Sequence, residues 1–480
     1  MSLPKPRSVL FLLAFAALAG MTMWLPKNFK NAPSSIKLPA QSVCGPESGE
    51  LCTPIIQDPL PVPPPPEPSL APAPPPPPPP TFPKEKFDWE DPKNYVTGTP
   101  GTSFRDSLRQ DINYVTAFCL GGFSNQVICF ANLIYLGILS NRVPVVPAFT
   151  PSHHISYEEP SLPFSAVFDI DYLRRAVGYP ILEWSDIKEV PAHRQDPYPA
   201  APEPLGCWTI RAGEFPYGPA SFWEHLHLDT SFTDVPDDTY FGGKPEDSYS
   251  FTTFWKLAAL IFPKDPLHQG RTYDVRWPSE KTGLSIVPDQ HMSCFDTSYY
   301  VSTEANIFEW EKAWSPAWRS IGSNLHFTEE MIAMATNNLR HAFGLSSLQS
   351  LPPFVSVHVR RGDFKDIGFA PLADYEVAVE EVIWELELQG IRDPEVFVSS
   401  DEKSAEFWED VEGMGWTRYD HDEQKTEEKY GEWIPPIIDT VMHSLASGFV
   451  GSGQSTYSLI AQRRVEDWHE GPTRIVKLTR

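Results

Sequence analysis

The sequence lacks an excess of basic residues. Its 480 residues contain 38 Lys and Arg against 63 Asp and Glu, which gives a formal net charge of -25. Binding to a nucleic-acid backbone requires a basic surface, so this composition argues against a nucleic-acid partner. A small anionic ligand is still compatible with it, because arginines and helix N-termini reverse the sign of the potential within a pocket.

Several chemical motifs are also absent. None of the six cysteines forms a CxxC pair, which argues against a zinc ribbon or a thioredoxin-type site. The chain has no N-x-S/T glycosylation sequon, no G-x-x-x-x-G-K phosphate loop and no G-x-S-x-G nucleophile elbow. The even number of cysteines permits disulfides, with Cys44 and Cys52 in a local loop and Cys119 and Cys129 meeting across a glycine loop. Free buried thiols are the alternative for the last four cysteines, which are Cys119, Cys129, Cys207 and Cys294.

The N-terminus contains an uncharged stretch, Val9–Leu25, flanked by lysines and arginine. A helix needs about 17–25 residues to span a bilayer, so this stretch predicts a signal anchor. A cleaved signal peptide is the alternative, since Ala17–Ala19 forms an A-x-A site. We favour the anchor because the apolar run continues to Leu25, and either interpretation places the rest of the chain in the secretory lumen.

Proline is abundant, with 52 residues, and it is concentrated in Asp58–Pro83. Proline lacks a backbone donor and fixes φ, so this segment predicts a polyproline II rod. About 26 residues at about 3.1 Å each give a length of roughly 80 Å. We interpret the rod as a stem behind the anchor rather than as a ligand for SH3 or WW domains, which are cytosolic.

The folded region begins with a β-loop-α-β pattern. The sequence predicts a strand over Tyr114–Cys119, a glycine turn, and a helix over Asn125–Ser140 with Ser124 as its N-cap and Asn141 at its end. The elements expected next are a strand over Val143–Val146, a helix and strand within Phe164–Trp184, loops and short helices over Pro191–Pro278, and a helix over Met331–Phe343.

The C-terminal third alternates strands and helices of regular length. The predicted strands are Phe354–Val359, Glu395–Ser399, Trp416–Tyr419, Phe449–Gly451 and Arg474–Leu478. The predicted helices are Asp374–Gln389, Asp401–Glu412, Pro436–Ser447 and Ser455–Val465. This alternation is typical of a parallel sheet covered by helices on both faces, whose active-site residues follow the carboxyl ends of the strands.

Two loops after these strands suit a diphosphate. Arg360 and Arg361 follow a strand directly, with Gly362 allowing a turn and Asp363 able to hold an arginine in place. Ser455 and Thr456 begin a helix after a glycine turn, where backbone N–H groups and hydroxyls form a cradle for phosphate. A structural ion pair and ordinary helix capping are the respective alternatives.

Two Asp-x-Asp tripeptides, Asp169–Asp171 and Asp420–Asp422, are of a kind that holds a divalent ion in metal-dependent transferases. We interpret both as helix caps or acidic loops and predict no metal site.

The ordered set of motifs resembles the GDP-fucose protein O-fucosyltransferase superfamily. The glycine loop Leu120–Gln126 and the segment Val357–Phe364, which is similar to an H-x-R-R-x-D-[FW] motif, carry the resemblance. Further matching segments are Phe168–Leu173, Ser399–Glu402, Ile438–Asp439 and Phe449–Ser458.

This resemblance implies an α/β fold with two facing Rossmann-like domains of the GT-B type, and metal-independent, inverting transfer of fucose from GDP-fucose, with no cofactor besides the donor. It assigns catalytic roles to Arg360, which stabilises the leaving diphosphate, and to Asn125, near the reacting centre. The donor-binding residues that it implies are Gly121, Gly122, Phe123, His358, Arg361, Asp363, Asp439, Ser455, Thr456 and Tyr457. No glutamate lies in the glycine loop, so no catalytic base is assigned.

The expected organisation is a cytoplasmic tail and signal anchor (1–30), a proline-rich stem (31–86), an N-terminal Rossmann-like domain with an irregular insertion (87–345) and a C-terminal nucleotide-sugar-binding domain (346–480). We expect a single-pass type II protein of the Golgi or endoplasmic reticulum that acts on a protein or oligosaccharide acceptor. The alternatives are a transferase with another nucleotide sugar or a glycan acceptor, a catalytically inactive GT-B-like binding or chaperone module, and a cytosolic-facing scaffold that uses the proline rod.

Overall fold

The computed structural model describes residues 89–478, apart from 153, 192, 194–195, 212–215, 217–220, 243–251, 264–272 and 306. The predicted anchor at Val9–Leu25, the stem at Asp58–Pro83 and the pairing of Cys44 with Cys52 lie outside these residues and stay predictions. The chain divides after Lys86, and residues 87–480 form one compact unit.

Six parallel strands form the first sheet, in the order β3-β2-β1-β7-β4-β5. Their bounds are β1 Tyr114–Ala117, β2 Val143–Val146, β3 Leu182–Glu183, β4 Glu203–Thr209, β5 Leu228–Asp234 and β7 Met292–Phe295. Two short strands, β6 Thr252–Thr253 and β8 Val301–Ser302, pair separately. Strands β1 and β2 are buried throughout, as expected for a parallel sheet with both faces covered.

The expectation of loops and short helices over Pro191–Pro278 is wrong in one respect. The stretch contains short helices, among them α8, Phe254–Ile261, but it also contains the strands β4 and β5. The two strands carry little strand signal, because β4 begins with Glu-Pro and β5 buries polar residues such as Thr230 and Ser231. A strand that is buried on both faces also shows no alternation of apolar and polar residues.

Helix α3, Phe123–Ser140, connects β1 to β2. Its last turn ends at Asn141, which is left-handed with φ of 53° as predicted, but the N-cap is Gly122 rather than Ser124. Ser124 lies inside the first turn, where its buried hydroxyl has no hydrogen-bond partner among the described residues. Of the described helices, α3 alone is long and apolar enough to cross a membrane, but 78% of it is buried in the fold, which is typical of a core helix.

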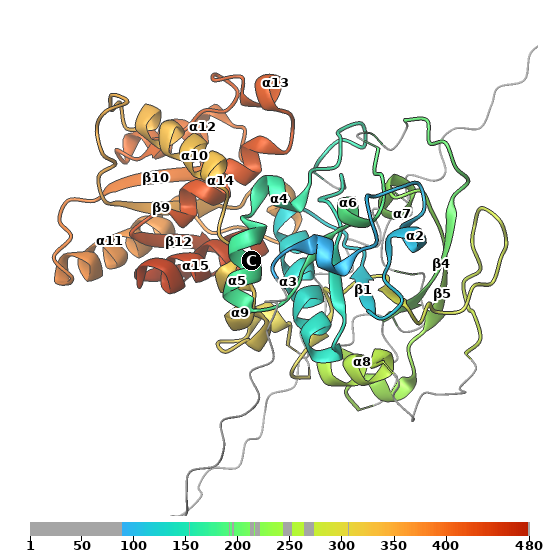
Figure 1. Ribbon diagram of the computed structural model, residues 1–480. Coiled ribbons are helices and arrows are strands. Elements are labelled where there is room, and N and C mark those ends of the chain that lie inside the picture. The colour runs from blue at the N-terminus through green and yellow to red at the C-terminus, as the bar shows by residue number, and fades with distance from the viewer. Residues whose placement is uncertain are drawn as a thin grey trace, which may run out of the picture. The chain divides into compact units, whose positions relative to one another are not determined.

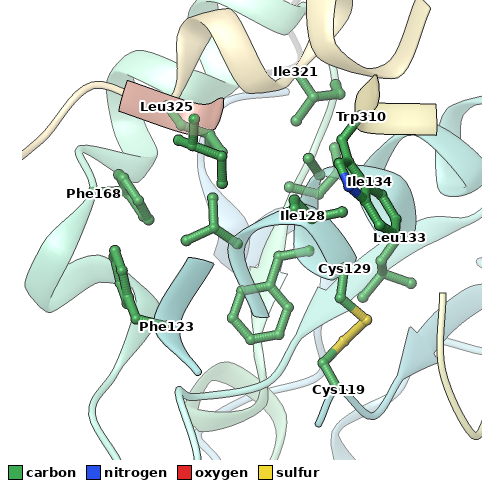
Figure 2. Close-up of a cluster of buried hydrophobic side chains, with 14 of the residues drawn as sticks. Cys119, Phe123, Ile128, Cys129, Leu133, Ile134, Phe168, Trp310, Ile321 and Leu325 are labelled. Carbon is green, nitrogen blue, oxygen red and sulfur yellow. A yellow bond between two sulfur atoms is a disulfide. The ribbon is translucent and has the colours of Figure 1, made fainter. Parts of the chain in front are cut away.

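The first hydrophobic core forms around α3 (Figure 2). The Phe123 ring packs 4.9 Å from the Phe149 ring and stacks on Phe168. A disulfide joins Cys119 to Cys129 across the glycine loop, which confirms the pairing that the sequence suggested.

A second disulfide joins Cys207 in β4 to Cys294 in β7. These strands are neighbours in the sheet, so the bond links segments 87 residues apart in sequence. Two disulfides within the described residues are typical of a protein that folds in an oxidising compartment.

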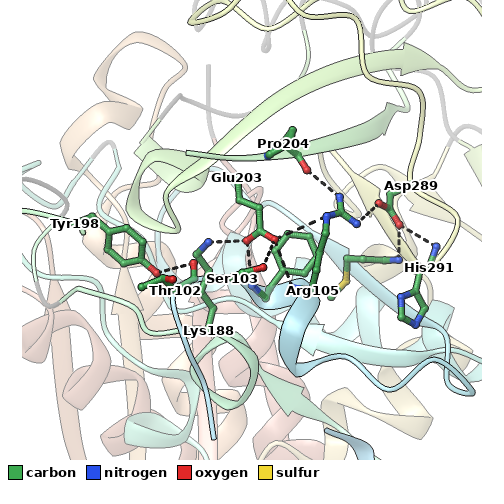
Figure 3. Close-up of polar contacts among 11 residues, drawn as sticks. Thr102, Ser103, Arg105, Lys188, Tyr198, Glu203, Pro204, Asp289 and His291 are labelled. Atoms are coloured by element: carbon green, nitrogen blue, oxygen red, sulfur yellow. Dashed lines mark hydrogen bonds and ion pairs between the residues drawn. The ribbon is translucent and has the colours of Figure 1, made fainter. Parts of the chain in front are cut away.

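A polar cluster lies at the end of this sheet where β4 begins (Figure 3). The Glu203 carboxylate accepts hydrogen bonds from Ser103 Oγ (2.8 Å), the Phe104 N–H (3.0 Å) and Lys188 Nζ (2.9 Å). It therefore satisfies the N-terminus of the short helix α2, Phe104–Ser107. We interpret this cluster as structural.

Five parallel strands form the second sheet, in the order β11-β10-β9-β12-β13. Their bounds are β9 Phe354–Val359, β10 Glu395–Ser400, β11 Thr417–Arg418, β12 Gly448–Ser452 and β13 Thr473–Val476. All five were predicted. Helices α11 Leu372–Leu388 and α15 Thr456–His469 pack against β12, and α14 Ile434–Ser444 packs against β9 (Figure 1).

The remaining described helices are short except for α10, which packs against α14. Their bounds are α4 Phe164–Val167, α5 Ile170–Val177, α6 Trp184–Ile187, α7 Ser221–His225, α9 Pro316–Ser320, α10 Glu329–Ala342, α12 Ala405–Gly413 and α13 Thr426–Tyr430.

The layers of the two sheets meet through one continuous apolar cluster. The Trp433 ring lies 6.2 Å from the Phe149 ring, and its Nε1–H donates to the Pro160 carbonyl at 2.9 Å. The structure is thus an α/β fold built on parallel sheets. The predicted domain limits 87–345 and 346–480 remain a prediction.

Candidate functional site

The site begins at the carboxyl end of β9, which is a central strand of the second sheet. His358 is buried in this strand, and its Nδ1 lies 2.7 Å from Ser458 Oγ. Burial, together with the positive charge of Arg360, lowers the pKa of His358 to about 3. The imidazole is therefore neutral at physiological pH and held in one orientation.

Arg360 follows β9 and is held by two carboxylates. Its Nη2 lies 2.7 Å from Asp363 Oδ1 and its Nη1 lies 2.7 Å from Asp401 Oδ2, with 19% of the side chain exposed. The Arg360 N–H donates to Ser452 Oγ at 2.8 Å, which fixes the backbone at the end of β12. The predicted contact with Asp363 is present, whereas Asp401 was not among the predicted site residues.

Asp401 also organises the loop after β9. Its Oδ1 accepts the Arg361 N–H at 2.7 Å. A Cβ at Gly362 would collide with the Asp401 carboxylate, so this position requires glycine for the close approach. One carboxylate thus fixes both the loop and the Arg360 guanidinium.

Arg361 packs against aromatic rings. Its guanidinium lies 4.1 Å from the Phe369 ring and 5.0 Å from the Phe407 ring. The sequence suggested two guanidiniums acting on one ligand, and for Arg361 this role stays a prediction.

The N-terminus of α15 forms the second part of the site. Ser455 is its N-cap, with Oγ accepting the Ser458 N–H at 3.3 Å. Thr456 Oγ1 donates to Asn125 Oδ1 at 2.7 Å. Because Asn125 lies in the first turn of α3, this bond joins the N-terminal ends of two helices, each of which has backbone N–H groups without a partner inside the helix.

The glycine loop before α3 depends on its first glycine. Gly121 has φ of +107°, and a Cβ there would lie 2.6 Å from Asn125 Nδ2. Its carbonyl accepts from Ser152 Oγ and Gln126 Nε2, both at 2.9 Å. Both constraints explain why glycine is required beside Asn125.

Neither Gly122 nor Phe123 presents a side chain to a ligand at this site. Gly122 is the N-cap of α3, and the Phe123 ring is buried in the core. Gly122 and Phe123 can therefore contact a ligand only through their backbone groups.

His154 lies across from Arg360 and was missed by sequence reasoning. Its Nε2 is 3.4 Å from Arg360 Nη2 and 4.0 Å from Asp363 Oδ2. Its Cδ2 is 3.5 Å from where a Gly122 Cβ would be, so His154 connects Arg360 to the start of α3. Partial burial and the Arg360 charge lower the pKa of His154 below its usual value.

Tyr457 in α15 and Asp439 in α14 extend the site. The Tyr457 ring lies 4.5 Å from the His358 ring, and its hydroxyl donates to the Pro436 carbonyl at 2.7 Å. Asp439 Oδ1 accepts from His421 Nε2 at 2.9 Å. The neutral His358, the Tyr457 ring and the Asp439 carboxylate thus follow one another from β9 toward α14.

The Asp-x-Asp tripeptides have structural contacts. Asp169 caps α5 by accepting the Tyr172 N–H at 2.8 Å, and Asp171 pairs with Arg174 at 2.8 Å. The described part of the chain contains no group of three or more His, Cys, Asp or Glu side chains placed to hold a metal ion.

Together these residues form a site that suits an anion with an attached ring system. One guanidinium and two helix N-termini supply positive potential, while a neutral histidine, a tyrosine ring and a carboxylate lie further along.

The chain matches the family model described as GDP-fucose protein O-fucosyltransferase over residues 114–466. It is similar to the crystal structure of apo POFUT1, at 15% identity and a TM-score of 0.48, over 77% of this chain and 99% of that chain. It is similar to POFUT1 in complex with GDP-fucose, at 16% identity and a TM-score of 0.47, over 77% and 98%. It is also similar to fucosyltransferase NodZ from Bradyrhizobium, at 15% identity and a TM-score of 0.35, over 73% and 92%. No curated protein sequence matches the chain.

Proposed function

Since the chain belongs to the GDP-fucose protein O-fucosyltransferase family, whose members are GDP-fucose-dependent fucosyltransferases, we propose that it transfers fucose to a hydroxyl of a protein or glycan acceptor. The observation that supports this site is the 2.7 Å hydrogen bond between Asn125 and Thr456. It brings the starts of α3 and α15 together near Arg360, where a diphosphate gains most from positive potential.

In this proposal the donor diphosphate lies between Arg360 and the start of α15. Its oxygens replace Asp363 and Asp401 on the guanidinium, which then forms a planar fork with the phosphate. Ser455 and Thr456 contribute hydroxyls and helix N–H groups. Asp439 and Tyr457 contact the guanine nucleoside, and His358 supports it from the strand.

Transfer proceeds by single displacement at the anomeric carbon. The bond from this carbon to the phosphate oxygen breaks, and its electron pair leaves with GDP. The acceptor oxygen bonds to the opposite face of the carbon, so the configuration inverts, and its proton passes to solvent water. Arg360 and the helix N-termini stabilise the charge that develops on GDP, which is a form of electrostatic catalysis.

Because the protein's own cationic and dipolar groups face the leaving group, we propose that the reaction needs no metal ion. For the cellular setting we propose a type II membrane protein of the Golgi or endoplasmic reticulum. The predicted anchor and stem support that orientation, and the two disulfides fit an oxidising lumen.

Calorimetric titration of the full-length chain in mild detergent with EDTA tests the proposal. GDP, GDP-fucose, GDP-mannose and a UDP-sugar are the ligands. We expect selective binding of GDP and GDP-fucose that EDTA does not weaken. A well-folded chain that binds no nucleotide contradicts the assignment, and tighter binding of GDP-mannose or a UDP-sugar assigns another donor.

A further inference from the structure

His421 and Asp439 form an ion pair that the proposed chemistry does not use. His421 Nε2 lies 2.9 Å from Asp439 Oδ1, and the two side chains are only 17% and 18% exposed. An aspartate that is largely buried keeps its charge and orientation best when a cation holds it. The pair therefore determines how the Asp439 carboxylate is presented.

The surroundings of His421 favour its protonated form. Burial alone would lower the pKa of His421, but the Asp439 carboxylate, with Asp420 and Asp422, raises it above the usual value. Asp420 is itself engaged by Arg418 at 2.9 Å. Asp439 is thus the acidic side chain in direct contact with the imidazole.

Apart from Asp439, the His421 ring has a ring contact but no second hydrogen bond among the described residues. The Tyr419 ring packs 4.9 Å away, edge to face, and the Thr426 N–H donates to the His421 carbonyl at 2.9 Å. The buried Nδ1 has no hydrogen-bond partner among the described residues. Asp439 is therefore the contact that orients the ring.

The pair lies next to the proposed nucleoside site. Pro436, one helical turn before Asp439 on α14, accepts the hydrogen bond from the Tyr457 hydroxyl. The Asp439 charge also acts on Tyr457, whose pKa burial raises well above its usual value. The carboxylate therefore lies beside the side chain that follows the phosphate cradle of Ser455 and Thr456.

We propose that His421 is a positioning residue for guanine recognition, which holds the Asp439 carboxylate toward the N1–H and 2-amino group of the base; this inference rests on the proposed function. Guanine presents two adjacent donors on that edge, whereas adenine and uracil do not. An ionised carboxylate has about four lone-pair sites, so Oδ1 can accept from both His421 and guanine while Oδ2 accepts the second donor.

The test compares binding of GDP and of IDP, which lacks the 2-amino group, to the full-length chain. The variants are His421→Leu, which removes the contact, and His421→Gln, which keeps an N–H donor without the charge. Asp422→Asn is the matched control, because it removes a neighbouring charge but no contact with Asp439. Thermal unfolding of each variant confirms that it is folded.

We expect the wild type to prefer GDP to IDP by about 10- to 100-fold, which is the range of one charge-assisted hydrogen bond. His421→Leu loses most of this preference because GDP binding weakens more than IDP binding. His421→Gln keeps most of it, and Asp422→Asn keeps all of it. Neutral His421 still donates from Nε2 to Asp439, so as the pH rises through the raised pKa of His421 we expect the wild-type preference to fall only slightly, to the level of His421→Gln.

Equal weakening of GDP and IDP in His421→Leu means a purely structural role and overturns the inference. Unchanged binding of both nucleotides in His421→Leu also overturns it, while leaving the proposed function intact if the wild type binds GDP. A folded wild type that binds neither nucleotide overturns both.

Discussion

Replacing Arg360 with alanine removes the one guanidinium that contacts both Asp363 and Asp401. Loss of a single pre-organised donor to a developing oxyanion costs about 3–4 kcal/mol of barrier, or about 10²–10³ in rate. We therefore expect GDP release from GDP-fucose to slow by that factor. Arg360→Lys keeps the charge but loses the planar fork, so we expect an intermediate loss.

The same replacement has a small effect on stability. Asp363 and Asp401 are 47% and 29% exposed, so water solvates both once the arginine is gone. Asp401 also keeps its bond to the Arg361 N–H. We expect the free energy of unfolding to fall by ~1 kcal/mol.

The assay is the initial rate of GDP release at saturating donor, with urea unfolding of the same samples. Arg175→Ala, at an exposed position of α5, is the matched control and is expected to retain the wild-type rate. A rate of Arg360→Ala within about threefold of wild type would refute the proposed stabilisation of the leaving group.

Two further predictions concern stability. Loop-closure entropy assigns about 4.6 kcal/mol of stability to the Cys207–Cys294 disulfide, which encloses 87 residues, and about 2.7 kcal/mol to the Cys119–Cys129 disulfide, which encloses 10. Replacing both cysteines of a pair with serine should therefore lower the free energy of unfolding more for Cys207 and Cys294. Urea unfolding measures the two losses, and equal losses would contradict this prediction. Because the pKa of His358 is lowered from 6.5 to about 3, the unfolded chain takes up a proton below pH 6.5 that the folded chain does not. The free energy of unfolding should then fall by about 1.4 kcal/mol per pH unit from this group between pH 6.5 and about 3, with no contribution above 6.5. A stability that is flat from pH 6.5 to 5 would contradict the lowered pKa of His358.

The second sheet could be predicted from the sequence because each strand is a short buried run followed by a helix. The predicted bounds Phe354–Val359 are those of β9. The helix expected over Asp401–Glu412 begins later, at Ala405, because Asp401 turns back to bind the loop after β9. Local pattern does not report such a long-range contact.

The nearness of Asp401 to Arg360 follows from the strand register. Val359 and Ser400 pair at the ends of β9 and β10, so the residues that follow them, Arg360 and Asp401, lie at the same edge of the sheet. No such pairing predicts the position of His154, because it lies in an irregular loop after β2 of the first sheet.

The glycine loop was predicted in place but not in detail. Its motif located Asn125 and Gly121, which the structure brings together with Thr456. The motif could not show that the Phe123 ring is directed into the core, because an aromatic residue at a helix start is compatible with either a ligand or a core contact.

Proton NMR of GDP-fucose incubated with the full-length chain is the most direct test of the central claim that this site cleaves a guanine nucleotide sugar by single displacement. Single displacement by water predicts slow release of GDP without an acceptor, with fucose appearing first in the inverted anomeric configuration. A donor that stays intact in the presence of a folded chain that binds GDP would contradict the transferase assignment, and fucose released with retained configuration would contradict single displacement.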